Sequence, residues 1–146
     1  AVKNSSMPVQ DIQMFKDAGI KARGENGFAV FNGPDEQFIS GRVMGADGGI
    51  GGTYAAMPEL LLQADALVRA NEMEKARELQ YAINNIIYAL CGCKGNMYGV
   101  IKEVLRRREN LDIGGVRAPL ANLVPEDMPK VEACCEMIAA AIRKYC

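Results

Sequence analysis

The sequence changes character near residue 57, and this change limits the folds that the chain can adopt. Before it, strand-like and helical segments alternate. They include a strand end at the N-terminus, a short apolar run between glycines at 27–33, and a glycine-rich run at 47–54 that suits only a very short strand or a turn. Such alternation predicts a parallel sheet of the α/β class. Two and a half strands are too few to cover a sheet or close a barrel, so we expect part of a larger unit.

The first helix is expected over residues 5–19. Ser6 is placed to cap its first turn, and Gly19 is expected to end it. Ile12 and Phe15 lie three residues apart and so share one face of this helix.

A second helix is expected over 34–46, where Pro34 and the acids that follow it suit the positive end of a helix dipole. From residue 57 onward the pattern predicts helices alone, because apolar residues recur at helical spacing in four stripes. By residue count the chain is therefore mostly helical. The stripes are Leu60, Leu61, Ala64, Leu67 and Val68; Ala76, Leu79, Ile83, Ile86, Ile87 and Leu90; Val100, Ile101, Val104 and Leu105; and Val131, Cys134, Cys135, Ile138 and Ile142.

Composition excludes several classes of function. Hydrophobic residues make up 49% and charged residues 24% of the 146 residues, which is typical of one globular domain. A formal net charge of −1 gives no electrostatic reason to expect nucleic acid or an anionic membrane as a partner. No stretch reaches the roughly 20 apolar residues of a membrane span. The N-terminal residues lack the pattern of a signal peptide, so we expect a cytoplasmic protein.

The cysteines do not form the pattern of a metal site. There are five cysteines and no histidine, so a zinc set with histidine is excluded. Cys134 and Cys135 are adjacent, and adjacent cysteines rarely bridge each other, so we expect reduced thiols. The basic run at 106–108 lies in a helical pattern close to Glu103 and Glu109, which predicts a solvated helix end.

An acidic pair followed by a run of glycines is the most informative local feature. Asp35 and Glu36 come just after the expected strand at 27–33, separated from it by Pro34, and five glycines lie between residues 45 and 52. Carboxylates at the end of a strand, beside bare backbone, suggest a site that grips polar oxygens. The alternative is a helix start followed by a turn. A phosphate-binding glycine loop is weakly supported, because no Lys-Ser pair follows the glycines.

Two segments carry a resemblance to a known family. VKNSS at 2–6 and FNGPDEQFISGRVMGADGGIGGTY at 31–54 resemble the N-acetylneuraminate lyase and dihydrodipicolinate synthase family of pyruvate-dependent Schiff-base lyases, and they are more similar to its sialate lyase branch. The resemblance implies a (β/α)₈ TIM barrel, of which this chain would supply the end of strand six to helix eight. Residues 1–56 would be the last βα units with active-site residues. Residues 57–146 would be helix eight and a C-terminal helical extension, within the same structural unit.

The resemblance assigns Lys3 to the Schiff-base lysine. Burial would lower its pKa so that a neutral amine attacks the ketone, and the resulting iminium is an electron sink for breaking the adjacent carbon–carbon bond. The implied reaction is retro-aldol cleavage of N-acetylneuraminate or a related 2-keto sugar acid to pyruvate and an aldehyde sugar, without metal or organic cofactor. The family's catalytic tyrosine and carboxylate-binding loop belong to the first half of the barrel. We therefore expect the isolated chain to be inactive, and to form a homo-oligomer or associate with the missing N-terminal half.

The resemblance also assigns residues that bind the substrate. Asp35 and Glu36 align with a pair that hydrogen-bonds hydroxyls of the sugar acid. Ser5 matches a hydroxyl residue that contacts the substrate, and Gly33 would offer its backbone where a side chain would collide. The expected substrate-binding set is Ser5, Gly33, Asp35, Glu36, Ile50, Gly51 and Gly52.

Two departures from the sialate lyase pattern concern the choice of sugar acid. Gly52 stands where that pattern has a substrate-binding serine, and Pro34 stands where an aromatic residue is usual in some members. VRAPL at 116–120 resembles the dihydrodipicolinate synthase branch, so condensation of pyruvate with an aldehyde is the alternative reaction. A non-catalytic fragment that only associates with another chain is the alternative from a different class.

Overall fold

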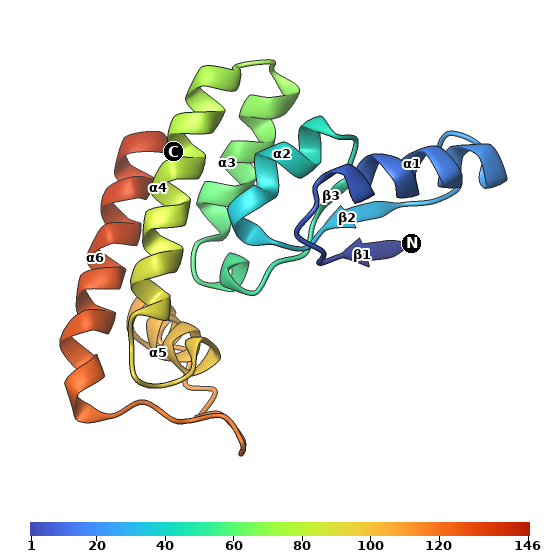
Figure 1. Ribbon diagram of the computed structural model, residues 1–146. Coiled ribbons are helices and arrows are strands. Elements are labelled where there is room, and N and C mark those ends of the chain that lie inside the picture. The colour runs from blue at the N-terminus through green and yellow to red at the C-terminus, as the bar shows by residue number, and fades with distance from the viewer.

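The computed structural model describes residues 1–146, and its strands form one small parallel sheet in the order β1-β2-β3 (Figure 1). Lys3 pairs in register with Phe31, and Phe31 pairs with Gly48. The predicted small parallel sheet is confirmed, and β1 and β3 are its two edges. The strands are β1 (Val2–Asn4), β2 (Val30–Asn32) and β3 (Gly48–Gly49).

Helices cover one face of this sheet. Ile12 of α1, Val30 of β2 and Ala46 form a small buried cluster there. Because side chains alternate along a strand, Lys3 and Phe31 point to the opposite face, where Lys3 is exposed. The two helices that connect the strands are α1 (Gln10–Arg23) and α2 (Phe38–Val43).

Four longer helices form the main hydrophobic core. α4 contacts each of the other three, and every residue of the four predicted stripes is buried or half-buried, so those stripes are confirmed. None of the helices has the length and apolar character that crossing a membrane requires. The helices are α3 (Pro58–Arg69), α4 (Met73–Cys91), α5 (Met97–Glu109) and α6 (Met128–Tyr145), and the 3₁₀ turns are η1 (Asp35–Gln37), η2 (Thr53–Ala55) and η3 (Pro125–Asp127).

The first helix begins later than predicted. α1 starts at Gln10, and Ser6 does not cap it. The Ser6 hydroxyl instead contacts the side chains of Asn4, at 2.9 Å, and Asp11, at 2.6 Å. Ser6 therefore fixes the turn between β1 and α1 through side chains rather than through the helix backbone.

The first helix also ends later than predicted, because Gly19 has a packing role. A Cβ at Gly19 would lie 2.9 Å from the Phe28 ring, so the glycine allows α1 to approach the segment before β2. The helix ends before Gly24, whose φ of 80° suits glycine. Phe15 does not share the burial of Ile12, since it is 42% exposed.

The second predicted helix, over 34–46, is shorter than expected. It consists of the turn η1 and then α2, which ends at Val43. Gly45 follows with a φ of 101°, which glycine adopts at little cost. The helix cannot continue through this residue, because a positive φ is not helical. The glycines after it form β3 and lead into η2, in agreement with the very short strand or turn predicted at 47–54.

The basic run at 106–108 is only partly solvated. Arg106 is half exposed and pairs with Glu103. The Arg108 side chain is only 17% exposed, and its guanidinium donates to the Ala56 carbonyl and to Glu59. The prediction of a solvated helix end is therefore wrong for Arg108, which ties α5 to the start of α3.

Candidate functional site

The segments that follow the three strands meet at one edge of the sheet. The Gly33 N–H donates to the Asn4 carbonyl at 2.8 Å, and the Ile50 N–H donates to the Asn32 carbonyl at 2.9 Å. The parallel pairing therefore continues one residue beyond β2 and β3, at the carboxyl ends of the strands. The candidate residues lie on these three segments: Lys3 and Ser5 on the first, Gly33, Asp35 and Glu36 on the second, and Ile50, Gly51 and Gly52 on the third.

Lys3 points to the face of the sheet that no helix covers. It is exposed, and its side chain makes no hydrogen bond or ion pair with the rest of the chain. A Schiff-base lysine is expected to be buried, and this chain alone does not bury Lys3, because α1 and α2 cover only the other face. The assignment of Lys3 as nucleophile stays a prediction.

Gly33 lies against the end of β1. A Cβ at this position would lie 2.4 Å from Ser5 Oγ and 2.6 Å from the Asn4 carbonyl oxygen. Any side chain at residue 33 would therefore push β2 away from β1 and disturb the position of Ser5. Ser5 itself is exposed at the carboxyl edge of the sheet.

Asp35 joins two of the three segments. It is 7% exposed, and its Oδ2 accepts hydrogen bonds from the Thr53 N–H at 2.8 Å and from the Thr53 hydroxyl. Its Oδ1 faces Gly51, where a Cβ would lie only 1.8 Å away. One oxygen of the predicted ligand-binding carboxylate is thus used inside the protein, and Gly51 leaves room for the other. Thr53 is not among the site residues expected from the sequence.

Two amide side chains of α4 hold the backbone of the acidic pair. Gln80 is 4% exposed; its Nε2 donates to the Asp35 carbonyl and its Oε1 accepts from the Ile39 N–H, each at 3.1 Å. Asn84 donates to the Glu36 carbonyl at 3.2 Å, and the Glu36 side chain is exposed. Neither amide is among the site residues expected from the sequence. A signal existed for Gln80, because a polar residue on a buried helix face needs hydrogen-bond partners.

Tyr54 has a buried hydroxyl without a hydrogen-bond partner. Burial, and then the nearby Asp35 carboxylate, raise the pKa of Tyr54. A Cβ at Gly49 would lie 2.4 Å from this hydroxyl. The Tyr54 ring packs edge-on against the Phe38 ring of α2, with 5.9 Å between the ring centroids. The hydroxyl therefore lies on the helix-covered side of β3, away from the face that carries Lys3.

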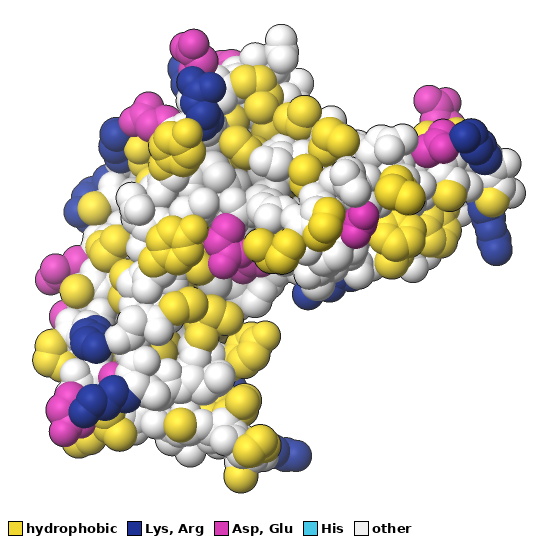
Figure 2. All heavy atoms as spheres, viewed as in Figure 1, with side chains coloured by type: hydrophobic (Ala, Val, Ile, Leu, Met, Phe, Trp, Pro, Cys, Tyr) yellow, Lys and Arg dark blue, Asp and Glu magenta, His cyan; other side chains and the backbone are white.

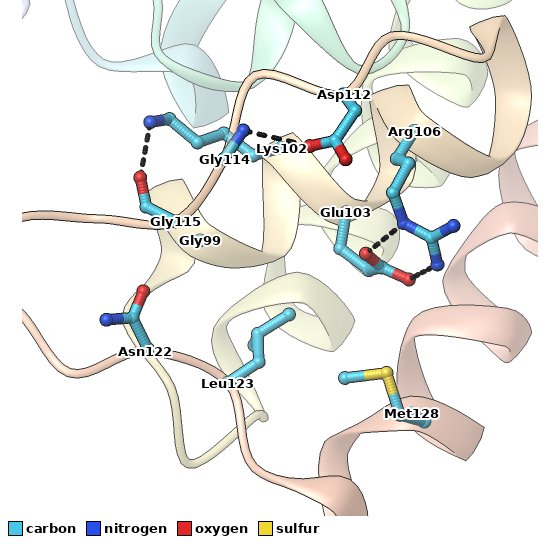
Figure 3. Close-up of a pocket in the computed structure, with 10 residues that line it drawn as sticks. All are labelled: Gly99, Lys102, Glu103, Arg106, Asp112, Gly114, Gly115, Asn122, Leu123 and Met128. Atoms are coloured by element: carbon cyan, nitrogen blue, oxygen red, sulfur yellow. Dashed lines mark hydrogen bonds and ion pairs between the residues drawn. The ribbon is translucent and has the colours of Figure 1, made fainter.

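A separate cavity of about 340 Å³ lies between α5 and the loop that precedes α6 (Figure 3). Lys102 donates to the Gly115 carbonyl at 2.6 Å, and Arg106 donates to both oxygens of Glu103 at 2.6 and 2.8 Å. The hydrogen bond from Arg106, with a further one from Arg107, lowers the pKa of Glu103 to about 2. Lys102 thus holds the loop against α5, whereas Glu103 and Arg106 form an ion pair within α5 itself.

The cysteines and acids form no further reactive cluster. All five cysteines are free thiols, and no group of three or more Cys, Asp or Glu residues is arranged to hold a metal ion. Burial raises the pKa of the Cys134 thiol to about 11. Cys134 is therefore protonated at neutral pH and behaves as a core residue.

The family to which the chain belongs follows from comparison with known proteins. The model of the dihydrodipicolinate synthetase family matches residues 2–138. The chain belongs to this family. It is 57% identical over 144 residues to N-acetylneuraminate lyase from Mediterraneibacter gnavus, a match that covers 99% of this chain and 44% of that protein. N-acetylneuraminate lyase from Salmonella agona is 31% identical over 116 residues, covering 80% of this chain and 38% of that protein.

Solved structures agree with this family membership. Wild-type Ruminococcus gnavus sialic acid aldolase superposes with a TM-score of 0.93 at 56% identity, covering 99% of this chain and 46% of that one. N-acetylneuraminate lyase from Fusobacterium nucleatum superposes with a TM-score of 0.73 at 23% identity, which shows a shared fold. The chain spans less than half the length of each of these relatives, and the predicted resemblance to the sialate lyase branch is confirmed.

Proposed function

We propose that this chain is the C-terminal part of a (β/α)₈ barrel that cleaves N-acetylneuraminate, or a related 2-keto sugar acid, to pyruvate and an aldehyde sugar. Residues 1–56 then supply the last βα units, and residues 57–146 supply helix eight and a helical extension. The observation that carries the proposal is the 57% identity, over 99% of the chain, to an N-acetylneuraminate lyase. Barrel enzymes bind substrates at the carboxyl ends of their strands, which is where the candidate residues of this chain converge.

Lys3 is the nucleophile of the proposed reaction. Its neutral amine adds to the C2 ketone of the sugar acid, and loss of water gives an iminium. A base removes the proton of the C4 hydroxyl, the C3–C4 bond breaks, and its electron pair moves into an enamine while the aldehyde leaves. Protonation of C3 restores the iminium, and addition of water releases pyruvate and free Lys3. The iminium accepts the electron pair, so the scheme needs no metal or organic cofactor.

The other candidate residues are proposed to bind the substrate. Glu36 presents an exposed carboxylate, and Asp35 keeps one oxygen free of internal hydrogen bonds. Carboxylates accept hydrogen bonds from several hydroxyls at once, as a polyhydroxylated substrate requires. Ser5 adds a hydroxyl at the neighbouring segment. Gly33, Gly51 and Gly52 add backbone groups where side chains are absent, and Ile50 adds its backbone and an exposed apolar side chain.

The base and the pocket for the keto-acid carboxylate are proposed to come from barrel segments outside this chain. Tyr54 is poorly placed to act as the base, because its hydroxyl lies on the helix-covered side of β3. The same segments would cover the face that carries Lys3 and pair with the free edges of β1 and β3. The active protein is therefore a complete barrel, formed with an N-terminal half or within a homo-oligomer.

Reductive trapping tests the proposal. Borohydride reduces an iminium formed with pyruvate, and peptide mapping then locates the modified lysine. The full-length protein containing this sequence is compared with Lys3→Ala and with Lys21→Ala, a control lysine that is exposed on α1. We expect an adduct on Lys3 in the wild type and in the control, no adduct in Lys3→Ala, and loss of N-acetylneuraminate cleavage only in Lys3→Ala.

The same experiment separates the alternatives. An adduct on Lys3 without cleavage of the sugar acid would favour condensation of pyruvate with an aldehyde, as in the dihydrodipicolinate synthase branch. The absence of any adduct would favour a non-catalytic fragment that only associates with another chain. Full turnover by Lys3→Ala would contradict the assignment of the nucleophile.

A further inference from the structure

The loop after β3 has no side chain at Gly52, and an aromatic ring from α5 lies over this position. A Cβ at Gly52 would lie 3.3 Å from Cε1 of Tyr98 and 3.8 Å from its hydroxyl oxygen. The methyl group of Met97 would lie 3.7 Å away. The first turn of α5 therefore reaches the third segment of the candidate site.

The position of Tyr98 is fixed by the start of its helix. The Asn96 side chain caps α5 by accepting a hydrogen bond from the Tyr98 N–H at 3.0 Å. The Asn96 N–H in turn donates to the Ala121 carbonyl at 2.9 Å. Tyr98 is 52% exposed, and its hydroxyl has no hydrogen-bond partner in the chain, so a donor and an acceptor remain free.

The helix α4 contacts both the segment that carries Glu36 and the first turn of α5, which carries Tyr98. Cys91 of α4 contacts the sulfur of Met97 at 3.6 Å. Asn84, two turns earlier on the same helix, donates to the Glu36 carbonyl at 3.2 Å. Glu36 and the pair formed by Tyr98 and Gly52 thus lie along the same helix, beside the segments that follow the strands.

The geometry points to Tyr98 as a substrate-contacting residue that selects the polyhydroxylated tail of the sugar acid. This inference rests on the proposed function. The phenol donates and accepts one hydrogen bond in the space that the missing side chain at Gly52 leaves, and the flat ring packs against C–H groups of the tail. Tyr98 thereby adds a contact from the helical extension to a site built on the barrel strands.

The test compares Tyr98→Phe with Tyr81→Phe in the full-length protein. Tyr81 is a matched control because it is 61% exposed on α4 and also makes no side-chain hydrogen bond. Loss of one hydroxyl contact is expected to raise the KM for N-acetylneuraminate by about fivefold to tenfold, with kcat within about twofold of the wild type. Tyr98→Phe should leave pyruvate trapping on Lys3 unchanged. It should also leave the KM for a short 4-hydroxy-2-keto acid unchanged, because that substrate has no polyhydroxylated tail.

A rescue variant keeps the inference open to contradiction. In Tyr98→Ala, Gly52→Ser should recover part of the lost affinity, because the serine hydroxyl enters the space that the ring has left. An unchanged KM for N-acetylneuraminate in Tyr98→Phe would overturn the inference about Tyr98. Cleavage of N-acetylneuraminate by the wild type in the same assay would still uphold the proposed function. Equal effects on the long and the short substrate would show a structural role and also overturn it. A wild type that neither forms the adduct nor cleaves the sugar acid would overturn both.

Discussion

At the scale of single residues, the two acids of the pair have different environments. Asp35 is buried against Thr53, whereas Glu36 is exposed. The sequence identifies the pair and its place after a strand. It does not predict the division of roles, because Thr53 lies 18 residues further along and meets Asp35 only through the parallel pairing of β2 and β3. The buried Asp35 carboxylate also explains Gly51, since only a glycine at this position leaves room for Asp35 Oδ1.

Thr53→Val tests the internal role of Asp35. The substitution keeps the shape of the side chain and removes the hydroxyl that donates to the buried carboxylate. We expect a loss of about 1–3 kcal/mol in the free energy of unfolding, because a buried acceptor loses one of its partners. Urea denaturation of the full-length protein measures the loss. Thr53→Ser is the control that retains the donor, and equal destabilisation by Ser and Val would contradict the role of the hydroxyl.

At the scale of secondary-structure elements, the strongly periodic segments were the predictable part. α3 to α6 follow from apolar residues at helical spacing, which also identify their buried faces. The ends of α1 did not follow, because Ser6 prefers side-chain partners and Gly19 is needed for packing against Phe28. The contact between α4 and the acidic pair was also not predictable, since Gln80 and Asp35 are 45 residues apart.

The contact of α4 with the site predicts an effect of Gln80→Ala. The change leaves the Ile39 N–H and the Asp35 carbonyl without their side-chain partner, at a cost of about 1–3 kcal/mol in the free energy of unfolding. It also loosens the turn that carries both acids. The fold-increase in the KM for the sugar acid should therefore exceed the fold-decrease in the yield of the pyruvate adduct on Lys3. Asn85→Ala, an exposed position on the same helix, is the control. If Gln80→Ala destabilises the protein but leaves the KM for the sugar acid unchanged, α4 contributes to the fold and not to substrate binding.

The link between α5 and α6 predicts a dependence on pH. Arg106 and Arg107 hold Glu103, and Arg107 also pairs with Glu132 of α6. The pKa of Glu103 in the folded protein, about 2, lies below the ordinary glutamate value of roughly 4.3. The stability that Glu103 contributes is therefore fully present above the ordinary value and is lost as the pH falls toward the folded value.

Glu103→Gln removes this contribution. The free-energy difference between wild type and variant should be constant near neutral pH and should narrow as the pH falls below about 5. Denaturant unfolding at a series of pH values measures this difference. Glu126→Gln, at an exposed acid without an ion pair, controls for the change of charge. A difference that stays constant down to the acid limit of folding would contradict the proposed ion pairs.

At the scale of the whole molecule, the chain has an open side. The arm formed by the sheet and α1 projects from the group of longer helices and leaves a concave side between them (Figure 2). The sequence predicts such an open sheet, because it contains too few strands to close a barrel. It did not predict which face would be left uncovered. That face is set by the alternation that places Val30 toward α1 and Lys3 and Phe31 away from it.

The open side predicts how the 146-residue chain behaves alone. β1 and β3 have unpaired edges, and Phe31 lies on the uncovered face, so we expect association that increases with protein concentration. Light scattering after size-exclusion chromatography measures the mass at several concentrations. Phe31→Ser should weaken the association, whereas Tyr81→Ser, which removes an exposed aromatic residue from α4, should not. Adding the N-terminal half of the barrel should convert the self-associated forms of the chain into one complex, which forms a pyruvate adduct on Lys3. A chain that stays monomeric and forms the adduct by itself would show that three strands suffice to build the environment of this lysine.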